Sequence, residues 1–257
     1  MFLEEGNMNK KIIIQIPFNV QGFNKENELN EEWIDYRLKL FIGWNVKSLK
    51  AQTNQWFTAL LRCRDETLEY IKERIERLIP ENVFIVGVKE YHEKTQELIR
   101  GYEYLYQVRM DSDDLYEKNF IDLLHNFYPK PETEVLISQR CYTHDINQGR
   151  LAYFHYTSPQ SYVLIYKTPE YRLGKRHILK NGHGGAILLK HELLSGINYM
   201  DTVHKKNDSS YFEAGKGGKK DWSEIEDKND IREILKDFGI AREETNETEK
   251  AKNIISH

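Results

Sequence analysis

Short apolar runs alternate with longer stretches of helical periodicity along the first 110 residues. Residues 12–16 form a β-branched run closed by Pro17, which predicts a buried strand because proline cannot donate to a sheet. Apolar positions three or four residues apart predict amphipathic helices. Alternating strands and helices predict an α/β fold with a doubly wound, mostly parallel sheet. The predicted strands cover residues 12–16, 56–61, 83–86 and 104–110, and the predicted helices cover residues 31–52, 66–79 and 93–103.

The second half of the chain has shorter elements separated by turns. This pattern of short elements favours a C-terminal extension of the sheet with mixed parallel and antiparallel strands. Residues 241–257 are too polar to be buried and predict a mobile tail. We therefore expect one domain over residues 1–240, with a nucleotide-binding half at about 8–110 and an acceptor half at 111–240. The elements predicted here are strands at residues 134–141, 151–156 and 162–167 and a helix at residues 229–238.

The composition of the 257 residues narrows the functional classes. There are 37 basic and 41 acidic side chains, a formal net charge of -4, so the chain lacks the positive field of a general nucleic-acid-binding protein. No apolar stretch approaches the roughly 18 residues of a membrane span, and the N-terminus does not resemble a signal peptide. Cys63 and Cys141 fit buried thiols in a reducing compartment. We expect a soluble, cytoplasmic protein.

Three carboxylates directly follow the strand predicted at residues 104–110: Asp111, Asp113 and Asp114. In open α/β sheets the carboxyl ends of the strands border the ligand crevice. Carboxylates this close repel one another unless a cation or hydrogen-bond donors compensate them, and Mg²⁺ or Mn²⁺ bound also to substrate phosphates would do so. The alternative is that Asp114 caps the following helix, which carries Phe120, while the other two lie in a solvated turn.

Five motifs in order along the chain resemble those of GT-A-fold glycosyltransferases, and among these the rhamnosyltransferase-like family. The similarity covers roughly residues 10–215. It implies a GT-A-like fold and a metal-dependent enzyme that transfers a sugar from a UDP- or dTDP-linked donor to a glycan or other hydroxyl acceptor. The motifs are QIPFN at residues 15–19, Arg37 with Phe41 in the first helix, SLKAQT at residues 48–53, RMDSDD at residues 109–114 and HGGAILL at residues 183–189.

The resemblance also implies roles on the donor side. Asp113 would bind the Mn²⁺ or Mg²⁺ that bridges the donor diphosphate, and Asp111 would lie near the ribose beside this ion. Asp65 would bind the edge of uracil or thymine, or cap the helix predicted at residues 66–79. Arg100 would contact a phosphate or the base, or be an ordinary exposed arginine. The nucleotide-sugar-binding residues implied in this way are Pro17, Asn19, Asp65, Arg100, Asp111 and Ser112.

For the catalytic base, the resemblance indicates an acid well beyond the acidic cluster. Asp201 and Asp208 lie in that window, and we favour Asp208 as the group that deprotonates the acceptor in an inverting reaction. His204 would add a ligand to the metal, or be exposed in a polar loop. The acceptor side would be formed by His183, Gly184 and Gly185, although the glycines also fit a tight turn.

Two other functions stay open at the level of sequence. A nucleotidyltransferase on a related α/β fold would use the same aspartates but direct the attack at the α-phosphate. A glycine-rich, basic loop after the first strand would favour it, and residues 19–23 are a poor version of such a loop. A catalytically silent carbohydrate-binding or assembly protein would keep the fold alone.

Overall fold

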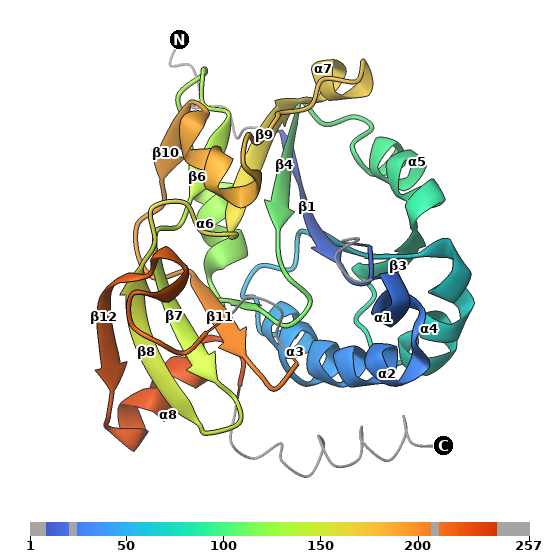
Figure 1. The fold of residues 1–257 in the computed structure, drawn as a ribbon. Coiled ribbons are helices and arrows are strands. Elements are labelled where there is room, and N and C mark those ends of the chain that lie inside the picture. The colour runs from blue at the N-terminus through green and yellow to red at the C-terminus, as the bar shows by residue number, and fades with distance from the viewer. Residues whose placement is uncertain (1–8, 21–24, 207–210, 241–257) are drawn as a thin grey trace.

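The computed structural model describes residues 9–20, 25–206 and 211–240, which form two β-sheets with helices packed around them (Figure 1). Within these residues the larger sheet has seven strands in the order β10-β6-β9-β4-β1-β2-β3. The mostly parallel α/β sheet expected from the sequence is confirmed. Its strands are β1 (Lys10–Pro17), β2 (Thr58–Cys63), β3 (Val83–Gly87), β4 (Tyr104–Arg109), β6 (Val135–Ile137), β9 (Tyr162–Lys167) and β10 (His191–Leu193).

The order of the four parallel strands creates a switch point in the sheet. On one side β1 pairs with β2, where Ile13 lies opposite Thr58, and β3 continues beyond β2. On the other side β1 pairs with β4, where Lys10 lies opposite Tyr104. The chain therefore builds outward from β1 through β2 and β3 and then returns to the opposite side of β1. Open α/β sheets bind ligands at the carboxyl ends of the strands at such a point.

Strand β1 is buried on both faces, which explains its unbroken apolar run. Ile12, Ile14 and Ile16 pack on one face, in a cluster shared with four helices. Ile13 packs on the other face with residues of α5 (Val88–Leu98) and α7 (Thr168–Arg172). The helices of the first face are α2 (Glu31–Leu40), α3 (Val46–Lys50), α4 (Leu68–Ile75) and α6 (Phe120–Asn126), and a short α1 (Lys25–Leu29) precedes them.

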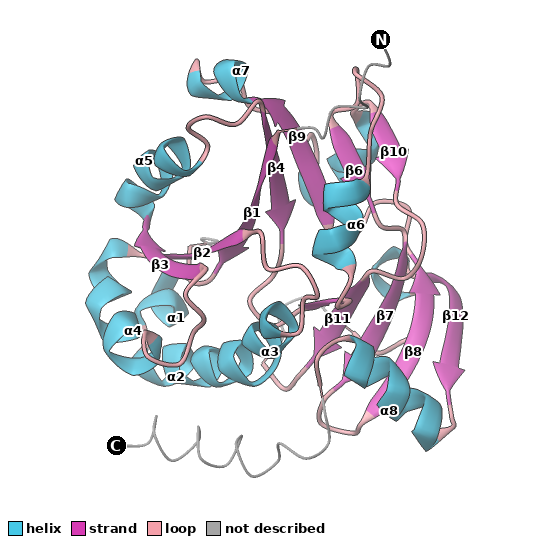
Figure 2. Ribbon diagram, turned by 180° about the vertical axis from the view of Figure 1, so that it is seen from behind, coloured by secondary structure: helices cyan, strands magenta, loops and turns pink. Residues whose placement is uncertain are grey.

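A second sheet of five described strands, in the order β12-β8-β7-β11-β5, lies beside the first, and α8 (Lys228–Asp237) packs against it (Figure 2). Leu151, Met200 and Phe238 form the buried cluster beneath α8. The C-terminal half therefore extends the first sheet only through β9, β6 and β10. Its other strands are β5 (Leu115–Tyr116), β7 (Arg140–Asp145), β8 (Arg150–His155), β11 (Tyr199–Val203) and β12 (Lys220–Ile225).

Three predicted elements differ from the structure. The helix expected at residues 31–52 contains a π-helical turn, Phe41–Asn45, between α2 and α3. The single strand expected at residues 134–141 is divided, because β6 pairs with β9 in the first sheet whereas β7 pairs with β8 in the second. The helix expected at residues 93–103 begins and ends five residues earlier, as α5 (Val88–Leu98). The glycine-pair motif at residues 183–189 lies largely in a 3-10 helix, Gly182–Leu188, entered through the left-handed residue Asn181.

The tail predicted at residues 241–257 lies outside the described residues. Among the helices that are described, none combines the length and the apolar character that crossing a membrane requires.

Candidate functional site

A cavity of about 360 Å³ opens at the switch point between β1 and β4. Its walls come from the carboxyl-terminal parts of β1, β2 and β4, from the start of β9 and from the 3-10 helix that contains His183. Its position is therefore the one at which a doubly wound sheet binds its ligand. The lining residues are Gln15, Pro17, Val20, Arg62, Gln107, Arg109, Tyr162, Leu164 and His183.

Two larger hollows lie at the opposite, amino-terminal end of the same strands. One, of about 810 Å³, is lined by Tyr104 and by residues of α7. The other, of about 620 Å³, is lined by Lys10, Lys11 and Trp56. Size alone would favour these hollows, but neither lies at the carboxyl ends of the parallel strands, so we assign the candidate site to the switch-point cavity.

The switch-point cavity is cationic. Arg62 on β2 and Arg109 on β4 flank the end of β1, and no carboxylate is among the described residues that line the cavity. The Nε of Arg62 is buried without a hydrogen-bond partner in the described part of the chain, and its guanidinium lies 5.2 Å from the centre of the Tyr91 ring. An unpartnered buried donor is costly, so an anion in this cavity would be stabilised.

His183 brings an uncharged imidazole to the cavity wall. Burial, and next to it the positive charge of Arg109, lower the pKa of His183, while Asp111 opposes the shift. The Nδ1 of His183 lies 3.4 Å from the hydroxyl of Tyr162, and Ser158 donates to the His183 carbonyl over 3.1 Å. Tyr162 thus contacts the ring and Ser158 holds the backbone of His183, and the lowered pKa keeps the ring neutral at pH 7.

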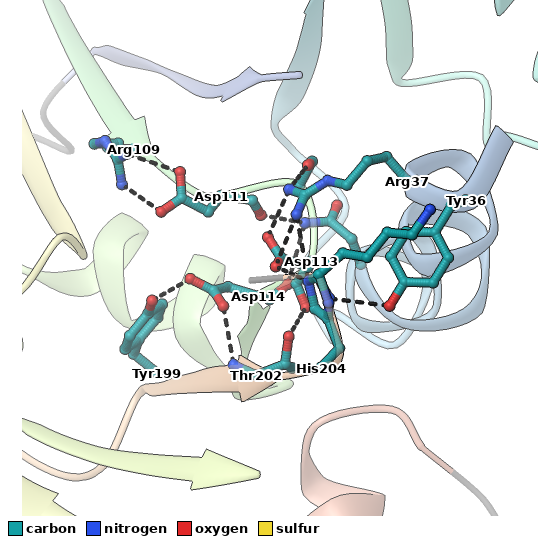
Figure 3. A network of polar contacts seen from close by, with 12 residues as sticks. Tyr36, Arg37, Arg109, Asp111, Asp113, Asp114, Tyr199, Thr202 and His204 are labelled. Carbon is teal, nitrogen blue, oxygen red and sulfur yellow. Dashed lines mark hydrogen bonds and ion pairs between the residues drawn. The ribbon is translucent and has the colours of Figure 1, made fainter. Parts of the chain in front are cut away.

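Asp111 holds Arg109 in a two-pronged ion pair. The two guanidinium nitrogens donate to the two carboxylate oxygens over 2.7 and 3.1 Å, and Arg109 also donates to the carbonyl of Gln160 over 3.2 Å (Figure 3). A bidentate pair fixes the guanidinium plane. Asp111 therefore acts on the cavity through the orientation of Arg109.

Asp113 lies deeper and is bound by groups from two distant segments (Figure 3). Arg37 of α2 donates to both of its oxygens, over 3.1 and 3.3 Å, and His204 lies 2.9 Å from one of them. Burial raises the pKa of Asp113, but the charge of Arg37 and the hydrogen bond from His204 outweigh it and lower the pKa to about 2. Ser112 accepts from Arg37 over 2.7 Å. Asp113 is therefore ionised within a closed polar cluster.

Asp114 connects the two sheets. It accepts a short hydrogen bond from the hydroxyl of Tyr199 and a 3.1 Å bond from the backbone N–H of Thr202, both on β11. Burial and the neighbouring acids raise the pKa of Asp114 well above its ordinary value. The prediction that Asp114 caps the next helix is wrong, because α6 begins at Phe120 after Asn119, and β11 satisfies the carboxylate instead.

The donors around Asp113 differ from those that the expected metal site requires. In the described residues no group of three or more His, Cys, Asp and Glu side chains could hold a metal ion. The Nδ1 of His204 accepts from the backbone N–H of Lys206 over 3.3 Å and lies 3.0 Å from the Tyr36 hydroxyl, so its Nε2 carries the proton that Asp113 accepts. With both oxygens of Asp113 also bound by Arg37, the donors present do not fit Mn²⁺ or Mg²⁺.

Several donor-side residues of the sequence analysis lie at the switch point in different roles. Pro17 lines the cavity. Asn19 is buried and its amide joins α1 to the end of β2, donating to the Glu28 carbonyl and accepting from the backbone N–H of Arg64. Asp65 begins the 3-10 turn Asp65–Thr67 that leads into α4, but its side chain accepts from the backbone N–H of Lys89 over 3.3 Å, at the start of α5, and does not cap its own helix.

Other expected residues are not brought to the cavity. Arg100 precedes β4 and is exposed at the opposite end of the sheet from Asp111. Gly185 packs against the backbone of Lys180, where a Cβ would come within 2.1 Å of the carbonyl oxygen. Gly184, by contrast, has open space where its Cβ would be. Asp208 lies outside the described residues.

Asp201 is buried on β11 and forms an ion pair of 2.7 Å with Lys219. The side chains of both partners are less than a tenth exposed, and the hydroxyl of Thr143 lies 3.4 Å from the same carboxylate oxygen. A base that deprotonates an acceptor must be within hydrogen-bond reach of it. The pairing with Lys219 therefore favours a structural role for Asp201.

Arg62 was not among the residues expected at the site, and Arg37 and Arg109 were expected there only as parts of motifs. A signal was available for two of them, since Arg62 and Arg109 each lie at or next to the end of a predicted strand, where a ligand crevice is expected. Nothing local indicates that Arg37, 76 positions before Asp113, would be its partner.

No family model matches the chain, and no curated protein matches its sequence. Among solved structures, S. aureus TarS 1-349 is similar with a TM-score of 0.40 and 15% identity over 75% of this chain, which spans 60% of that one. The structure of TarS 1-349 in complex with UDP gives the same values. A cytidylyltransferase from Leptospira borgpetersenii has a TM-score of 0.39 and 14% identity over 96% of this chain and 97% of that chain. Similarities this remote do not identify a function.

Proposed function

We propose that this protein is a nucleotide-sugar transferase that binds a UDP- or dTDP-linked sugar in the switch-point cavity. The observation that carries the proposal is the pair of arginines, Arg62 and Arg109, placed on the two strands that flank β1, in a cavity whose described lining has no carboxylate. Guanidinium groups bind phosphate oxygens through paired hydrogen bonds. Pro17, Tyr162 and Leu164 supply apolar surface on which a base or a sugar ring packs.

In the reaction, the bond between the anomeric carbon and the diphosphate oxygen breaks, and its electron pair leaves with the diphosphate. Arg62 and Arg109 stabilise the negative charge that grows on this leaving group. The acceptor hydroxyl oxygen forms the new bond to the anomeric carbon, and its proton passes to a base. We propose Asp208 as that base and an inverting outcome, following the glycosyltransferase resemblance.

The carboxylates near the cavity have supporting roles in this proposal. Asp111 positions Arg109 through the two-pronged pair, and the resemblance implies that it also contacts the ribose. Asp65, next to the carboxyl end of β2, is the proposed contact to the base edge, where its Oδ2 lies 3.9 Å from the Nζ of the exposed Lys89. His183 and the 3-10 helix around it form the proposed acceptor side.

A donor-hydrolysis screen tests this function. UDP-, dTDP-, GDP- and CDP-sugars are incubated with the full chain, and the released nucleoside diphosphate is measured with and without simple sugar acceptors. Release from one or two donors is expected, because water can replace the acceptor. Formation of pyrophosphate from a nucleoside triphosphate and a sugar phosphate would identify a nucleotidyltransferase instead. The absence of both turnover and nucleotide binding would contradict both assignments.

A further inference from the structure

Each carboxylate of the acidic segment after β4 has partners within the protein. Asp111 is paired with Arg109, Asp113 with Arg37 and His204, and Asp114 with uncharged donors on β11. The protein's own positive groups therefore compensate Asp111 and Asp113, while burial and the neighbouring acids raise the pKa of Asp114. A divalent ion at this place would have to compete with these partners.

Arg37 is firmly held against the carboxylate of Asp113. Its side chain is only 13% exposed, and that of Asp113 is 7% exposed. The guanidinium contacts both oxygens of Asp113 and the hydroxyl of Ser112, and it lies 5.8 Å from the centre of the Trp33 ring on the same helix. A buried guanidinium with this many contacts keeps a fixed geometry and a permanent charge.

His204 is also unsuited to ligate a metal in this arrangement. Its ring is fixed between the Asp113 carboxylate on Nε2 and Tyr36 with the Lys206 backbone on Nδ1. A metal needs a nitrogen lone pair, so Nε2 would have to lose its proton and its hydrogen bond to Asp113. Both the histidine and the aspartate would thus give up existing contacts.

We propose that this protein binds its nucleotide-sugar donor without a divalent cation, with Arg37 occupying the cation position at Asp113 and with Arg62 and Arg109 neutralising the diphosphate. This inference rests on the proposed function and adds to it that donor binding requires no divalent cation. Arg62 and Arg109 reach the cavity from both sides of β1, whereas Arg37 is not among the residues that line it and, by pairing with Asp113, keeps that carboxylate from repelling the diphosphate. Three permanent positive charges then replace the role of one divalent ion.

Calorimetric titration of the full chain with UDP and with dTDP, once in EDTA and once in Mn²⁺ or Mg²⁺, tests the proposal. We expect affinities that agree within about twofold between the two conditions, a difference well below the roughly 1.4 kcal/mol of a tenfold change. Affinity at least tenfold higher with Mn²⁺ would overturn the cation-independent site and leave the proposed function standing. Binding in neither condition would overturn the proposed function and this inference with it.

Two variants strengthen the test. Arg109→Gln should weaken UDP binding at least tenfold in EDTA, and Mn²⁺ should not restore it. Asp113→Asn should leave the ratio of UDP affinities with and without Mn²⁺ near one, as in the wild type. If Asp113 bound the metal, the wild type would bind UDP more tightly with Mn²⁺, and this substitution would abolish the enhancement. Arg172→Gln is the matched control, because Arg172 is exposed on α7, at the opposite end of the sheet.

Discussion

The switch-point cavity and the acidic segment beside it use their charges in opposite ways. In the cavity, Arg62 has a buried nitrogen without a partner among the described residues, and the described lining has no acid to neutralise it. In the acidic segment, Asp113 and Asp114 are each bound by two or more groups from distant parts of the chain. The carboxylates of the more conspicuous motif are therefore bound within the protein, whereas Arg62 lies in the cavity wall. A buried Nε without a partner among the described residues is found in Arg37 as well as in Arg62.

This difference shows how a charged motif should be interpreted. A row of carboxylates after a strand establishes where negative charge lies, but its chemistry depends on what the fold places opposite it. Here the fold places an arginine and a histidine opposite Asp113. The comparison predicts that variants of the acidic segment mainly alter stability, whereas variants of the cavity mainly alter catalysis.

The largest expected effect is on stability, from Arg37→Met. The substitution leaves the Asp113 carboxylate buried without its main counter-charge, which costs about 3–5 kcal/mol of unfolding free energy. Denaturant unfolding followed by circular dichroism measures it. The control is Arg74→Met, which breaks the half-exposed pair with Asp35 and should cost less than about 1 kcal/mol. Equal losses in the two variants would contradict the closed character of the Asp113 cluster.

The next largest effect concerns the base. Asp208→Asn should lower kcat by about 10² or more with little change in donor affinity, since a general base acts in the transition state. Asp201→Asn is the control: because Asp201 is buried against Lys219, we expect lower stability with kcat of the folded protein nearly unchanged. If Asp208→Asn is active, another group is the base, and NMR of the product anomer shows whether the reaction inverts.

A smaller effect is expected in the cavity itself. Arg62→Gln removes one charged donor to the diphosphate and should lower kcat/KM for the donor by about 10- to 100-fold, the range for hydrogen bonds to charged groups. The free energy of unfolding of this variant should stay within about 1 kcal/mol of the wild-type value, since the substitution removes a buried Nε that has no hydrogen-bond partner among the described residues. Steady-state kinetics beside Arg172→Gln checks this, and wild-type kcat/KM in Arg62→Gln would remove Arg62 from the site.

The smallest effect is a pH dependence of stability from the second sheet. Burial lowers the pKa of His144 to about 4, although Asp145 opposes the shift, and the ring contacts Trp44 at 5.3 Å. Between its ordinary pKa of 6.5 and about 4, the unfolded chain binds a proton that the folded protein does not. Stability should therefore fall as the pH falls through this window, by roughly 1–2 kcal/mol between pH 7 and pH 5.

Chemical denaturation at pH 7 and pH 5 measures the contribution of His144, with His144→Gln as the variant that cannot titrate. The loss between the two pH values should be smaller in the variant. An identical loss in both proteins would show that other groups control the acid sensitivity. Because His144 lies on β7 and not in the cavity, UDP affinity of the folded protein should not follow this transition.

Hydrophobic periodicity predicted most elements of the first 110 residues and the place of the acidic segment, although α5 begins five residues before the helix predicted at residues 93–103. β1, β3 and β4 coincide closely with their predicted strands, since strands buried on both faces leave unbroken apolar runs. Asp111, Asp113 and Asp114 follow β4, as expected. The local sequence does not predict that residues 134–141 are divided between two sheets, because both parts have the pattern of a strand and only their pairing partners differ.

The tertiary structure alone decided what the charged residues do. Arg37 and His204 reach Asp113 across 76 and 91 positions of sequence, and Lys219 covers Asp201. Hydrophobic periodicity specifies which face of an element is buried, but not which distant element that face meets. Strand order and loop path set those meetings. For this reason the same aspartates that indicated a metal in the sequence are compensated by the protein's own groups in the structure.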